Sequence, residues 1–522
     1  MLATVLSATL LGLDGRVIRV EVDVAPGLPG FTIVGLADAA LQEARERVRG
    51  ALRNAGFVHP PRRITVNLAP ADLRKAGASL DLAIAMGILL GSEQIQPARG
   101  RIALIGELSL GGEVRTVPGI LPMVAALARR GVRRVVVPLD AVDEAALVAG
   151  IDSAPVETLA AAVELVRSSR SRRVTVAAAR VDAAGTDVAP RGPSIALLPE
   201  RVVPDLAEVR GQLEARRGLE IAVAGGHGLL LIGPPGSGKT LLARTIPGLL
   251  PPLDDDAALA ATVIASASGE APVRELVRRP PFRTPHHTIS YAAMVGGGPR
   301  MSPGEVTLAD HGVLFLDELP EFGRDVLEAL REPLEEGRVA IARVGRATTF
   351  PARFQLVAAM NPCPCGNAGS DAPACSCATG VPERYAARIS GPLRDRIDLW
   401  VLMPRVPAAA LVGGSLPEDS ATVASRVVAA RARQILRPPG RLNSRVGGRT
   451  LRAACRLDRA AERRAIELAE MERLSGRGME RLLRVARTIA DLAGADDVES
   501  EHLAEAARFR SPASRLSQLL AG

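Results

Sequence analysis

A loop rich in glycine and proline constrains the fold of this chain more than any other segment. It fits the pattern G-x-x-x-x-G-K-[ST] and consists of Gly233, Pro234, Pro235, Gly236, Ser237, Gly238, Lys239 and Thr240. The apolar run 229–232 before it predicts a buried strand, and residues 241–244 predict the start of a helix. In that context the glycines let backbone N–H groups wrap a phosphate beside a helix N-terminus. The segment therefore predicts an α/β domain built around a phosphate-binding loop.

The lysine and the threonine of this loop have separate predicted roles. We expect Lys239 to reach the β- and γ-phosphates of ATP and Thr240 to bind Mg²⁺. The chain contains 65 lysines and arginines together, yet only Lys75 and Lys239 are lysines. A planar guanidinium does not replace a compact ammonium well in a phosphate clamp. A lysine at 239 in a chain so biased toward arginine supports the prediction.

Two further apolar runs end in polar residues suited to ATP hydrolysis. Residues 313–316 are followed by Asp317 and Glu318. We expect Asp317 to share the Mg²⁺ with the loop and Glu318 to polarise the attacking water. The run 356–360 is followed by Asn361, whose amide could orient that water. An asparagine before a proline is also a common turn residue, so this alternative stays open.

Composition sets the broad class of the protein. A length of 522 residues predicts two or more domains, and 2% aromatic residues imply cores of Ala, Val, Leu and Ile. The net charge of +8 permits contact with nucleic acid, although an arginine-rich solvated surface would give the same value. No apolar run reaches the length of a membrane span. The apolar residues 1–11 lack a positive flank and, with 16–24, predict a hairpin and not a signal peptide, so we expect a cytoplasmic protein.

The pattern along the chain divides it into four segments. Residues 1–167 mix short strands with helices, and 168–193 form a polar stretch rich in Arg, Ala and Gly that predicts a linker. Strands and helices alternate over 194–405 around the phosphate-binding loop, and 406–522 predict a connector and a helical domain. In the first segment we expect strands at 64–68, 102–105 and 134–138 and helices at 39–55 and 80–90.

Four of the five cysteines lie close together, as two C-x-C pairs: Cys363, Cys365, Cys375 and Cys377. Four thiolates can complete a tetrahedral Zn²⁺ shell. Structural zinc knuckles usually carry C-x-x-C, so free thiols and a disulfide remain alternatives. The fifth, Cys455, lies on an apolar helix face and is predicted to be a core residue.

The adjacent histidines at 286 and 287 are also candidate metal ligands. Neighbouring residues on a strand point to opposite faces, and no carboxylate or third histidine lies at ligand spacing in the sequence. We therefore expect His286 and His287 to contact substrate or to support the structure.

Long stretches of the sequence resemble the ComM/YifB family of magnesium-chelatase-like AAA+ ATPases. The matching stretches span nearly the whole chain and include 30–38, 64–73, 281–288, 312–322 and 389–398. The resemblance implies an α/β fold: an AAA+ P-loop ATPase core with a C-terminal helical lid, preceded by an α+β Lon-protease-like, ChlI-type domain. It also implies assembly into a homo-hexameric ring that uses ATP and Mg²⁺.

The resemblance assigns roles residue by residue. Lys239 and Thr240 match Walker A, Asp317 and Glu318 match Walker B, and Asn361 matches sensor 1.

Further arginines match positions that complete such a site. Arg396 matches the arginine finger, which would reach the γ-phosphate of the neighbouring subunit, although Arg394 stands where an apolar residue is expected. Arg477, in 475–479, matches the sensor 2 position, and Arg473 and Arg481 are close enough in sequence to compete for that role.

In the first domain, Ser79 falls where the Lon fold carries its nucleophile, but Leu121 stands at the position of the catalytic lysine. Lys75, the other lysine, lies on the wrong side of the expected dyad. A serine without a base is not activated, so we expect a non-proteolytic scaffold.

The resemblance favours a motor that remodels branched or single-stranded DNA, by branch migration during DNA uptake and recombination. The alternative is a chelatase-type subunit that drives metal insertion into a tetrapyrrole. Because dedicated chelatase motors start near the ATPase core, the Lon-like domain favours the DNA motor. An ATP-dependent protease is disfavoured by Leu121.

Overall fold

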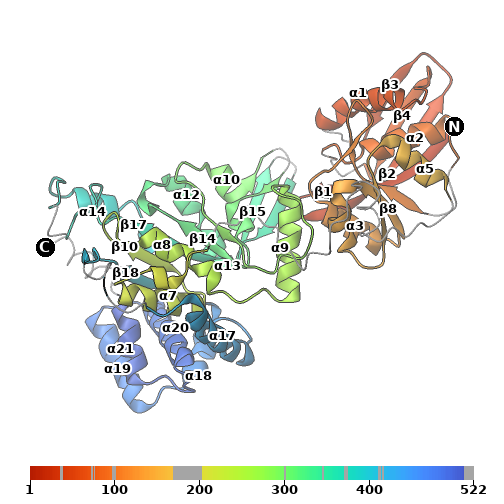
Figure 1. Ribbon diagram of the computed structural model, residues 1–522. Coiled ribbons are helices and arrows are strands. Elements are labelled where there is room, and N and C mark those ends of the chain that lie inside the picture. The colour runs from red at the N-terminus through yellow and green to blue at the C-terminus, as the bar shows by residue number, and fades with distance from the viewer. Residues whose placement is uncertain are drawn as a thin grey trace.

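The computed structural model of the chain describes three structured regions (Figure 1). The described residues are 1–35, 39–71, 75, 77–96, 101–168, 203–298, 301–343, 346–369, 374–408, 413 and 417–510. An N-terminal α/β domain, a central α/β domain and a C-terminal helical domain follow one another along the chain. Of the linker predicted at 168–193, all but Ser168 lies outside the described residues. The mixed α/β class with a parallel sheet is confirmed.

The N-terminal domain is built on a seven-stranded sheet of order β3-β4-β2-β1-β5-β8-β9. The predicted hairpin is present, with β1 paired antiparallel to β2 and joined by a tight turn. Its strands are β1 (Leu2–Leu11), β2 (Asp14–Ala25), β3 (Gly30–Val34), β4 (Arg63–Ala69), β5 (Ile102–Leu104), β8 (Arg134–Pro138) and β9 (Asp152–Val156). A separate short pair consists of β6 (Glu107–Leu108) and β7 (Val114–Arg115).

Helices cover this sheet, and the most apolar of them is almost wholly buried. The helices are α1 (Ala39–Asn54), α2 (Asp81–Gly91), α3 (Ile120–Arg129), α4 (Val142–Ala146) and α5 (Leu159–Arg167). Ten of the eleven residues of α2 are buried. A helix that is apolar on every side packs inside a domain, which explains this position.

The central domain contains a five-stranded parallel sheet of order β11-β14-β17-β10-β18. Its strands are β11 (Phe282–Arg283), β14 (Val313–Leu316), β17 (Gln355–Met360), β10 (Leu229–Ile232) and β18 (Leu399–Leu402). Every residue of β10, β14 and β17 is buried, as expected for a parallel sheet covered on both faces. Because these strands run in one direction, the residues that follow them meet at one edge of the sheet.

Helices and two small hairpins surround this sheet. The helices are α7 (Leu213–Gly225), α8 (Lys239–Arg244), α9 (Asp255–Ser268), α10 (Tyr291–Val295), α11 (Glu305–Leu308), α12 (Arg324–Ala329), α13 (Arg331–Glu336), α14 (Val381–Ala386) and α15 (Gly391–Arg394). The hairpins are β12 (Gly296–Gly297) with β13 (Ser302–Pro303), and β15 (Arg338–Arg343) with β16 (Arg346–Pro351).

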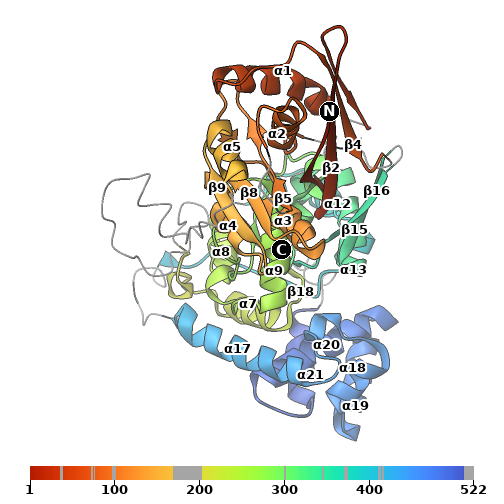
Figure 2. The ribbon, with the colours of Figure 1, turned by 90° about the vertical axis from the view of Figure 1, so that its right-hand side faces the viewer.

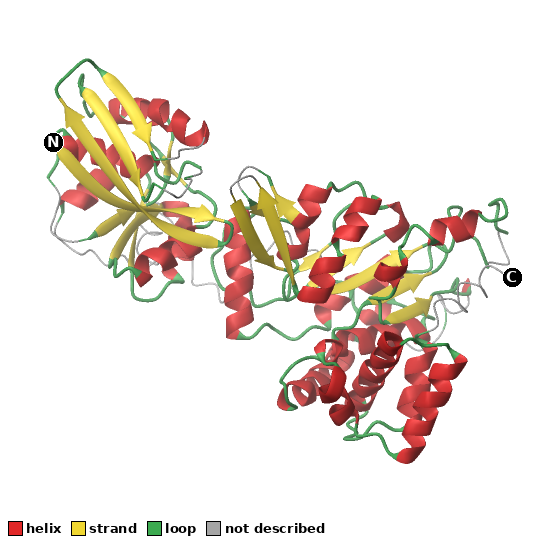
Figure 3. Cartoon of the chain, turned by 180° about the vertical axis from the view of Figure 1, so that it is seen from behind, coloured by secondary structure: helices red, strands yellow, loops and turns green. Residues whose placement is uncertain are grey.

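The C-terminal domain contains only helices and loops among its described residues, whereas the other two domains carry the strands (Figure 3). Its helices are α17 (Ser420–Leu436), α18 (Gly448–Cys455), α19 (Arg459–Met471), α20 (Gly476–Leu492) and α21 (Ser500–Arg508). Figure 2 shows this bundle below the central domain. Leu482, Val485 and Ile489 of α20 share one hydrophobic core with α7 and β10, so the bundle packs directly on the nucleotide domain. Within the described part of the chain, no helix has the length and apolarity needed to cross a bilayer.

The described residues include two contacts between the N-terminal and central domains. The turn of the β1–β2 hairpin approaches the β15–β16 hairpin so closely that a Cβ on Gly12 would lie 2.7 Å from Cγ2 of Thr348. At the second contact, α3 meets the end of α9, where the Gly119 N–H donates to the Ser266 carbonyl at 2.8 Å. The buried Glu144 carboxylate accepts from the Ser266 hydroxyl at 2.5 Å, which adds a side-chain link between the domains.

Candidate nucleotide-binding site

The phosphate-binding loop connects β10 to α8, as the sequence predicts. A Cβ on Gly233 would lie 2.2 Å from the carbonyl oxygen of Met403, so only glycine fits against the neighbouring strand end. Gly236 and Gly238 have φ values of +79° and +92°, the left-handed region in which glycine is favoured. These conformations turn the chain tightly between the strand and the helix.

The ammonium group of Lys239 lies inside the loop. Its Nζ donates to the carbonyl oxygens of Gly233 at 2.6 Å and Pro234 at 2.9 Å, and to Asn361 Oδ1 at 3.2 Å. The residue is 8% exposed, and burial lowers the pKa of the ammonium to about 8 despite the nearby charges of Asp317 and Glu318. Phosphate oxygens can therefore replace the loop carbonyls as partners of a cation that is already in position.

The two acidic residues after β14 differ in orientation. Asp317 Oδ2 accepts from the Thr240 hydroxyl at 2.7 Å, which joins the two predicted magnesium ligands directly. Glu318 has φ of +54° and a side chain that is 53% exposed, so its carboxylate is accessible to water. Hydroxyl and carboxylate oxygens are the ligands Mg²⁺ prefers, so Thr240 and Asp317 fit that ion.

Asn361 lies between these groups because β17 is inserted between β10 and β14. Ile232 pairs with Met360, and Leu316 pairs with Ala358, so the ends of all three strands adjoin. The Oδ1 atom of Asn361 accepts a hydrogen bond from the Lys239 ammonium at 3.2 Å.

His287 also belongs to this site, although no local sequence pattern indicated this contact. Its Nδ1 lies 3.4 Å from Glu318 Oε2, and its ring centroid is 4.1 Å from that of His286. The histidines do not lie on a strand, so the alternation of side chains along a strand does not apply to them: β11 ends at Arg283 and both follow it in a loop. The parallel pairing of Phe282 with Val313 brings this loop to the end of β14. Only strand order, which local spacing does not encode, could have revealed the contact.

Gln212 is a second residue that sequence patterns did not indicate. Its buried side chain donates to the carbonyl oxygens of Ser237 at 3.1 Å and Pro404 at 2.7 Å. It thereby links the phosphate-binding loop to the segment after β18. No motif marks this glutamine.

The candidate arginine finger makes contacts within its own chain. The guanidinium of Arg396 forms an ion pair with Glu335 and donates to the Pro392 carbonyl, and its side chain is 11% exposed. Arg394, at the end of α15, is half-buried. A role across a subunit boundary stays a prediction for both arginines.

The three candidates for sensor 2 occupy different environments. Arg477, in the first turn of α20, and Arg473 are exposed. Arg481 is buried, and its Nε lies 3.8 Å from Asp398 Oδ1 of the central domain. Burial of Asp398 acts to raise its pKa, but His227 and Arg481 outweigh that effect and hold the pKa low. Arg481 therefore joins the helical bundle to the nucleotide domain through a charged carboxylate.

The four clustered cysteines converge, as the C-x-C pattern allows. All four sulfurs lie within 4.8 Å of one another, with Cys363 Sγ 3.3 Å from Cys365 Sγ and 3.7 Å from Cys375 Sγ. Hydrogen bonds, the largest from the Asn367 N–H, lower the pKa of the Cys365 thiol to about 5, whereas desolvation and the neighbouring sulfurs raise the pKa of Cys375 and of Cys377. Among the described residues this is the one cluster of three or more side chains arranged to hold a metal ion, and the two adjacent histidines are not part of it.

The residues of the N-terminal domain that match a Lon-type protease site are buried and hydrogen-bonded within the protein. Ser79 is buried and its hydroxyl donates to the Ala8 carbonyl at 3.1 Å. Lys75 is buried and donates to the Pro70 carbonyl. The backbone N–H of Leu121 donates to Glu144 at 2.7 Å, so the position of the expected catalytic lysine lies at the contact with the central domain.

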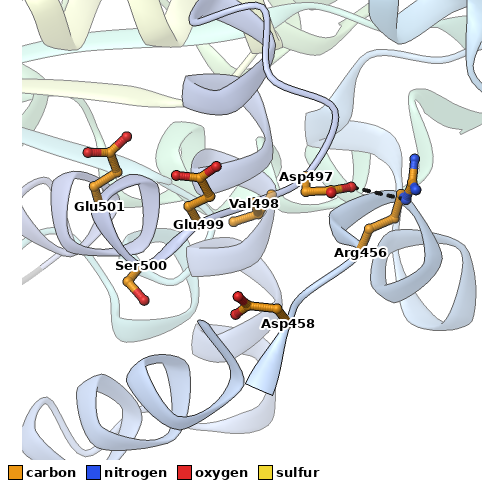
Figure 4. A pocket seen from close by; sticks show the side chains of 7 residues that line it. All are labelled: Arg456, Asp458, Asp497, Val498, Glu499, Ser500 and Glu501. Carbon is orange, nitrogen blue, oxygen red and sulfur yellow. Dashed lines mark ion pairs between the residues drawn. The ribbon is translucent and has the colours of Figure 1, made fainter. Parts of the chain in front are cut away.

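A surface pocket in the helical bundle is unsuited to nucleotide phosphates. Figure 4 shows that carboxylates dominate its lining, which consists of Arg456, Asp458, Asp497, Val498, Glu499, Ser500 and Glu501. The single arginine is paired to Asp497 at 3.0 Å. Four carboxylates would repel a polyphosphate, so this pocket is not a candidate nucleotide site.

Comparisons with known proteins show similarity to magnesium chelatase subunit ChlI over most of the chain. Three family models match: subunit ChlI of Mg-chelatase over 20–141, magnesium chelatase subunit ChlI over 205–411, and its C-terminal part over 417–510. An uncharacterized protein of Mycobacterium tuberculosis is 44% identical, with 98% of each chain covered. The uncharacterized protein YifB of Escherichia coli is 42% identical over 98% of this chain and 97% of its own. The competence protein ComM of Haemophilus influenzae is 39% identical over 99% of both.

Proposed function

We propose that this chain, which belongs to the ComM/YifB family of magnesium-chelatase-like AAA+ ATPases, is an ATP-driven motor that remodels branched DNA. The observation that carries the proposal is the set of direct contacts joining Lys239 to Asn361 and Thr240 to Asp317, with Glu318 beside them. These residues come from three strand ends and provide the phosphate-binding, magnesium-binding and water-orienting groups that one subunit contributes to ATP hydrolysis.

Each residue has a defined part in the proposed reaction. Lys239 exchanges the loop carbonyls for phosphate oxygens of ATP and neutralises their charge. Thr240 and Asp317 would hold Mg²⁺, which when bound offsets the charge on the β- and γ-phosphates. Glu318 orients the attacking water, and the Asn361 amide positions that water between the two strand ends. His287, close to Glu318, must leave that carboxylate free to contact the water.

A homo-hexameric ring would complete this site from the neighbouring subunit. We assign Arg396 as the group that reaches across the boundary, which requires its pairing with Glu335 to be exchanged for the γ-phosphate. Arg477 is assigned to sensor 2, and the cysteine cluster is assigned to Zn²⁺. The location we propose is the cytoplasm.

DNA is the proposed substrate, and branch migration during natural transformation the proposed process. The net charge of +8 suits a polyanion, and one of the similar full-length proteins is a competence protein. The second candidate function is a chelatase-type motor for metal insertion into a tetrapyrrole. The matching of all three regions by models of magnesium chelatase subunit ChlI favours this candidate.

ATP turnover measured with and without a four-way DNA junction tests the proposal. We expect the junction to stimulate hydrolysis several-fold more than duplex DNA of the same length, and Lys239→Ala to abolish the activity. If the protein hydrolyses ATP but neither the junction nor the duplex DNA changes the rate, the DNA motor is refuted and the chelatase-type candidate is favoured. Wild-type turnover in Lys239→Ala would refute the nucleotide site itself.

A further inference from the structure

The cysteine cluster is in direct contact with the phosphate-binding loop. Gly366, the residue after Cys365, packs so tightly on Pro235 that a Cβ at position 366 would lie 2.4 Å from Cδ of the proline ring. Gly366 has φ of +84°, so a glycine is needed there for the backbone as well. The turn that carries the first two cysteines therefore forms one wall of the nucleotide loop.

This turn is also continuous with the sensor 1 strand. Cys363 follows Asn361 by two residues and is fully buried. The Gly366 N–H donates to the Cys363 carbonyl at 3.0 Å, and the Ala368 N–H donates to the Cys363 sulfur at 3.3 Å. A displacement of the turn would therefore reach Asn361 on one side and Pro235 on the other.

The second pair of cysteines touches the turn through sulfur. Cys375 Sγ lies 3.7 Å from Cys363 Sγ and 3.6 Å from Cys365 Sγ, and it is exposed on the other side. In a tetrahedral Zn²⁺ site with Zn–S bonds of about 2.3 Å, neighbouring sulfurs are about 3.8 Å apart. The sulfurs of Cys363, Cys365 and Cys375 are separated by 3.3–3.7 Å, somewhat less than in that shell, and the Cys377 sulfur lies within 4.8 Å of them.

We propose that Zn²⁺ bound by these four thiolates clamps the 363–366 turn against Pro235 and so sets the affinity of the loop for ATP. The inference rests on the proposed function only in that ATP is taken to bind at this loop. Four cysteine sulfurs within 4.8 Å of one another provide the ligand number that a tetrahedral Zn²⁺ site requires. Zinc would tie the segment of Cys375 and Cys377 to the turn and hold Gly366 in its contact with the loop.

Two variants distinguish the effect of the metal from the effect of the contact between Gly366 and Pro235. The double substitution Cys375→Ser with Cys377→Ser removes two ligands at the exposed side and leaves the turn residues unchanged. Gly366→Ala keeps all four thiols but inserts a methyl group against Pro235. Ser376→Ala, an exposed position between the two ligands, is the matched control. Zinc content is measured by elemental analysis, and affinity by titration with a fluorescent ATP analogue.

We expect one zinc per wild-type chain and per control chain, and loss of zinc in the double variant. ATP should bind about tenfold more weakly to both the double variant and Gly366→Ala, since small displacements of a binding loop are costly. Gly366→Ala should retain its zinc. Zinc-free protein with wild-type ATP affinity would overturn the clamp, and wild-type protein purified without zinc would overturn the metal assignment. If the double variant fails to fold, unchanged ATP affinity in Gly366→Ala would still refute the role of the Gly366–Pro235 contact in ATP binding. Wild-type protein that holds zinc but binds no ATP would instead refute the proposed function.

Discussion

ATP affinity should decrease steeply above about pH 8, because burial lowers the pKa of Lys239 to about 8 in the nucleotide-free chain. Only the ammonium form can bind the phosphates, and the bound phosphates raise its pKa again. Below about pH 8 the lysine is already charged, so affinity should be constant there. Above it, binding must take up one proton, and affinity should decrease about tenfold for each pH unit.

The structure sets the size of this effect. With a pKa of about 8, roughly one-eleventh of the chains carry the ammonium at about pH 9, and roughly one in thirty at about pH 9.5. The dissociation constant for ATP should therefore rise about tenfold and about thirtyfold at these two values. The phosphates of ATP are ionised throughout this range and contribute no comparable change.

Isothermal titration calorimetry between about pH 7.5 and 9.5 measures both affinity and proton uptake, if two buffers of different ionisation enthalpy are used. The Lys239→Arg variant is the control, since a guanidinium stays charged and its residual affinity should not depend on pH. A constant dissociation constant up to about pH 9.5, with no buffer dependence of the enthalpy, would refute the reasoning from burial.

Three further expectations follow from the contacts. Glu318→Gln should bind ATP with wild-type affinity and hydrolyse it at least about a hundredfold more slowly, because glutamine keeps the shape of the water-orienting side chain but not its charge. Failure of this variant to bind ATP would contradict the role assigned to Glu318. Arg396→Ala and Lys239→Ala should each be inactive, but rings that mix the two should recover hydrolysis, because one variant keeps the phosphate-binding loop and the other keeps the arginine finger. Mixed rings without activity would exclude a role of Arg396 in trans. Full activity of Arg396→Ala alone would indicate that Arg394 is the finger. Glu144→Ala should lower the free energy of unfolding by about 1–3 kcal/mol, because two buried donors lose their acceptor, and an unchanged thermal unfolding midpoint would contradict it.

Sequence reasoning succeeded where the relevant residues are neighbours in the chain. The loop 233–240, the strand before Asp317 and the β1–β2 hairpin each carry a local pattern that physical rules can interpret. Apolar runs gave the buried strands of the parallel sheet because such strands are covered on both faces. Within the connector predicted from 406, helix α17 begins at Ser420 because the side chain of Asp419 caps its N-terminus.

The features of the site that could not be predicted depend on contacts between segments that lie far apart in the sequence. His287 meets Glu318 through strand pairing, Gln212 reaches Ser237 across the domain, and Gly366 meets Pro235 through the packing of two loops. None of these pairs has a fixed spacing in sequence, because their proximity is a property of the sheet order and the packing. The separation of Arg481 from the exposed Arg477 likewise depends on which face of α20 meets the central domain.

The scarcity of lysine has a consequence for labelling chemistry. The primary amines of this chain are those of Lys75, Lys239 and the N-terminus. The first is fully buried, and the N-terminal ammonium donates to the Val24 carbonyl at 2.7 Å. An amine with a pKa of about 8 is partly uncharged, and therefore nucleophilic, under mildly alkaline conditions. An acylating reagent that enters the loop should therefore mark Lys239 in preference to the buried Lys75, and protection of Lys239 from that reagent would report nucleotide occupancy of the loop.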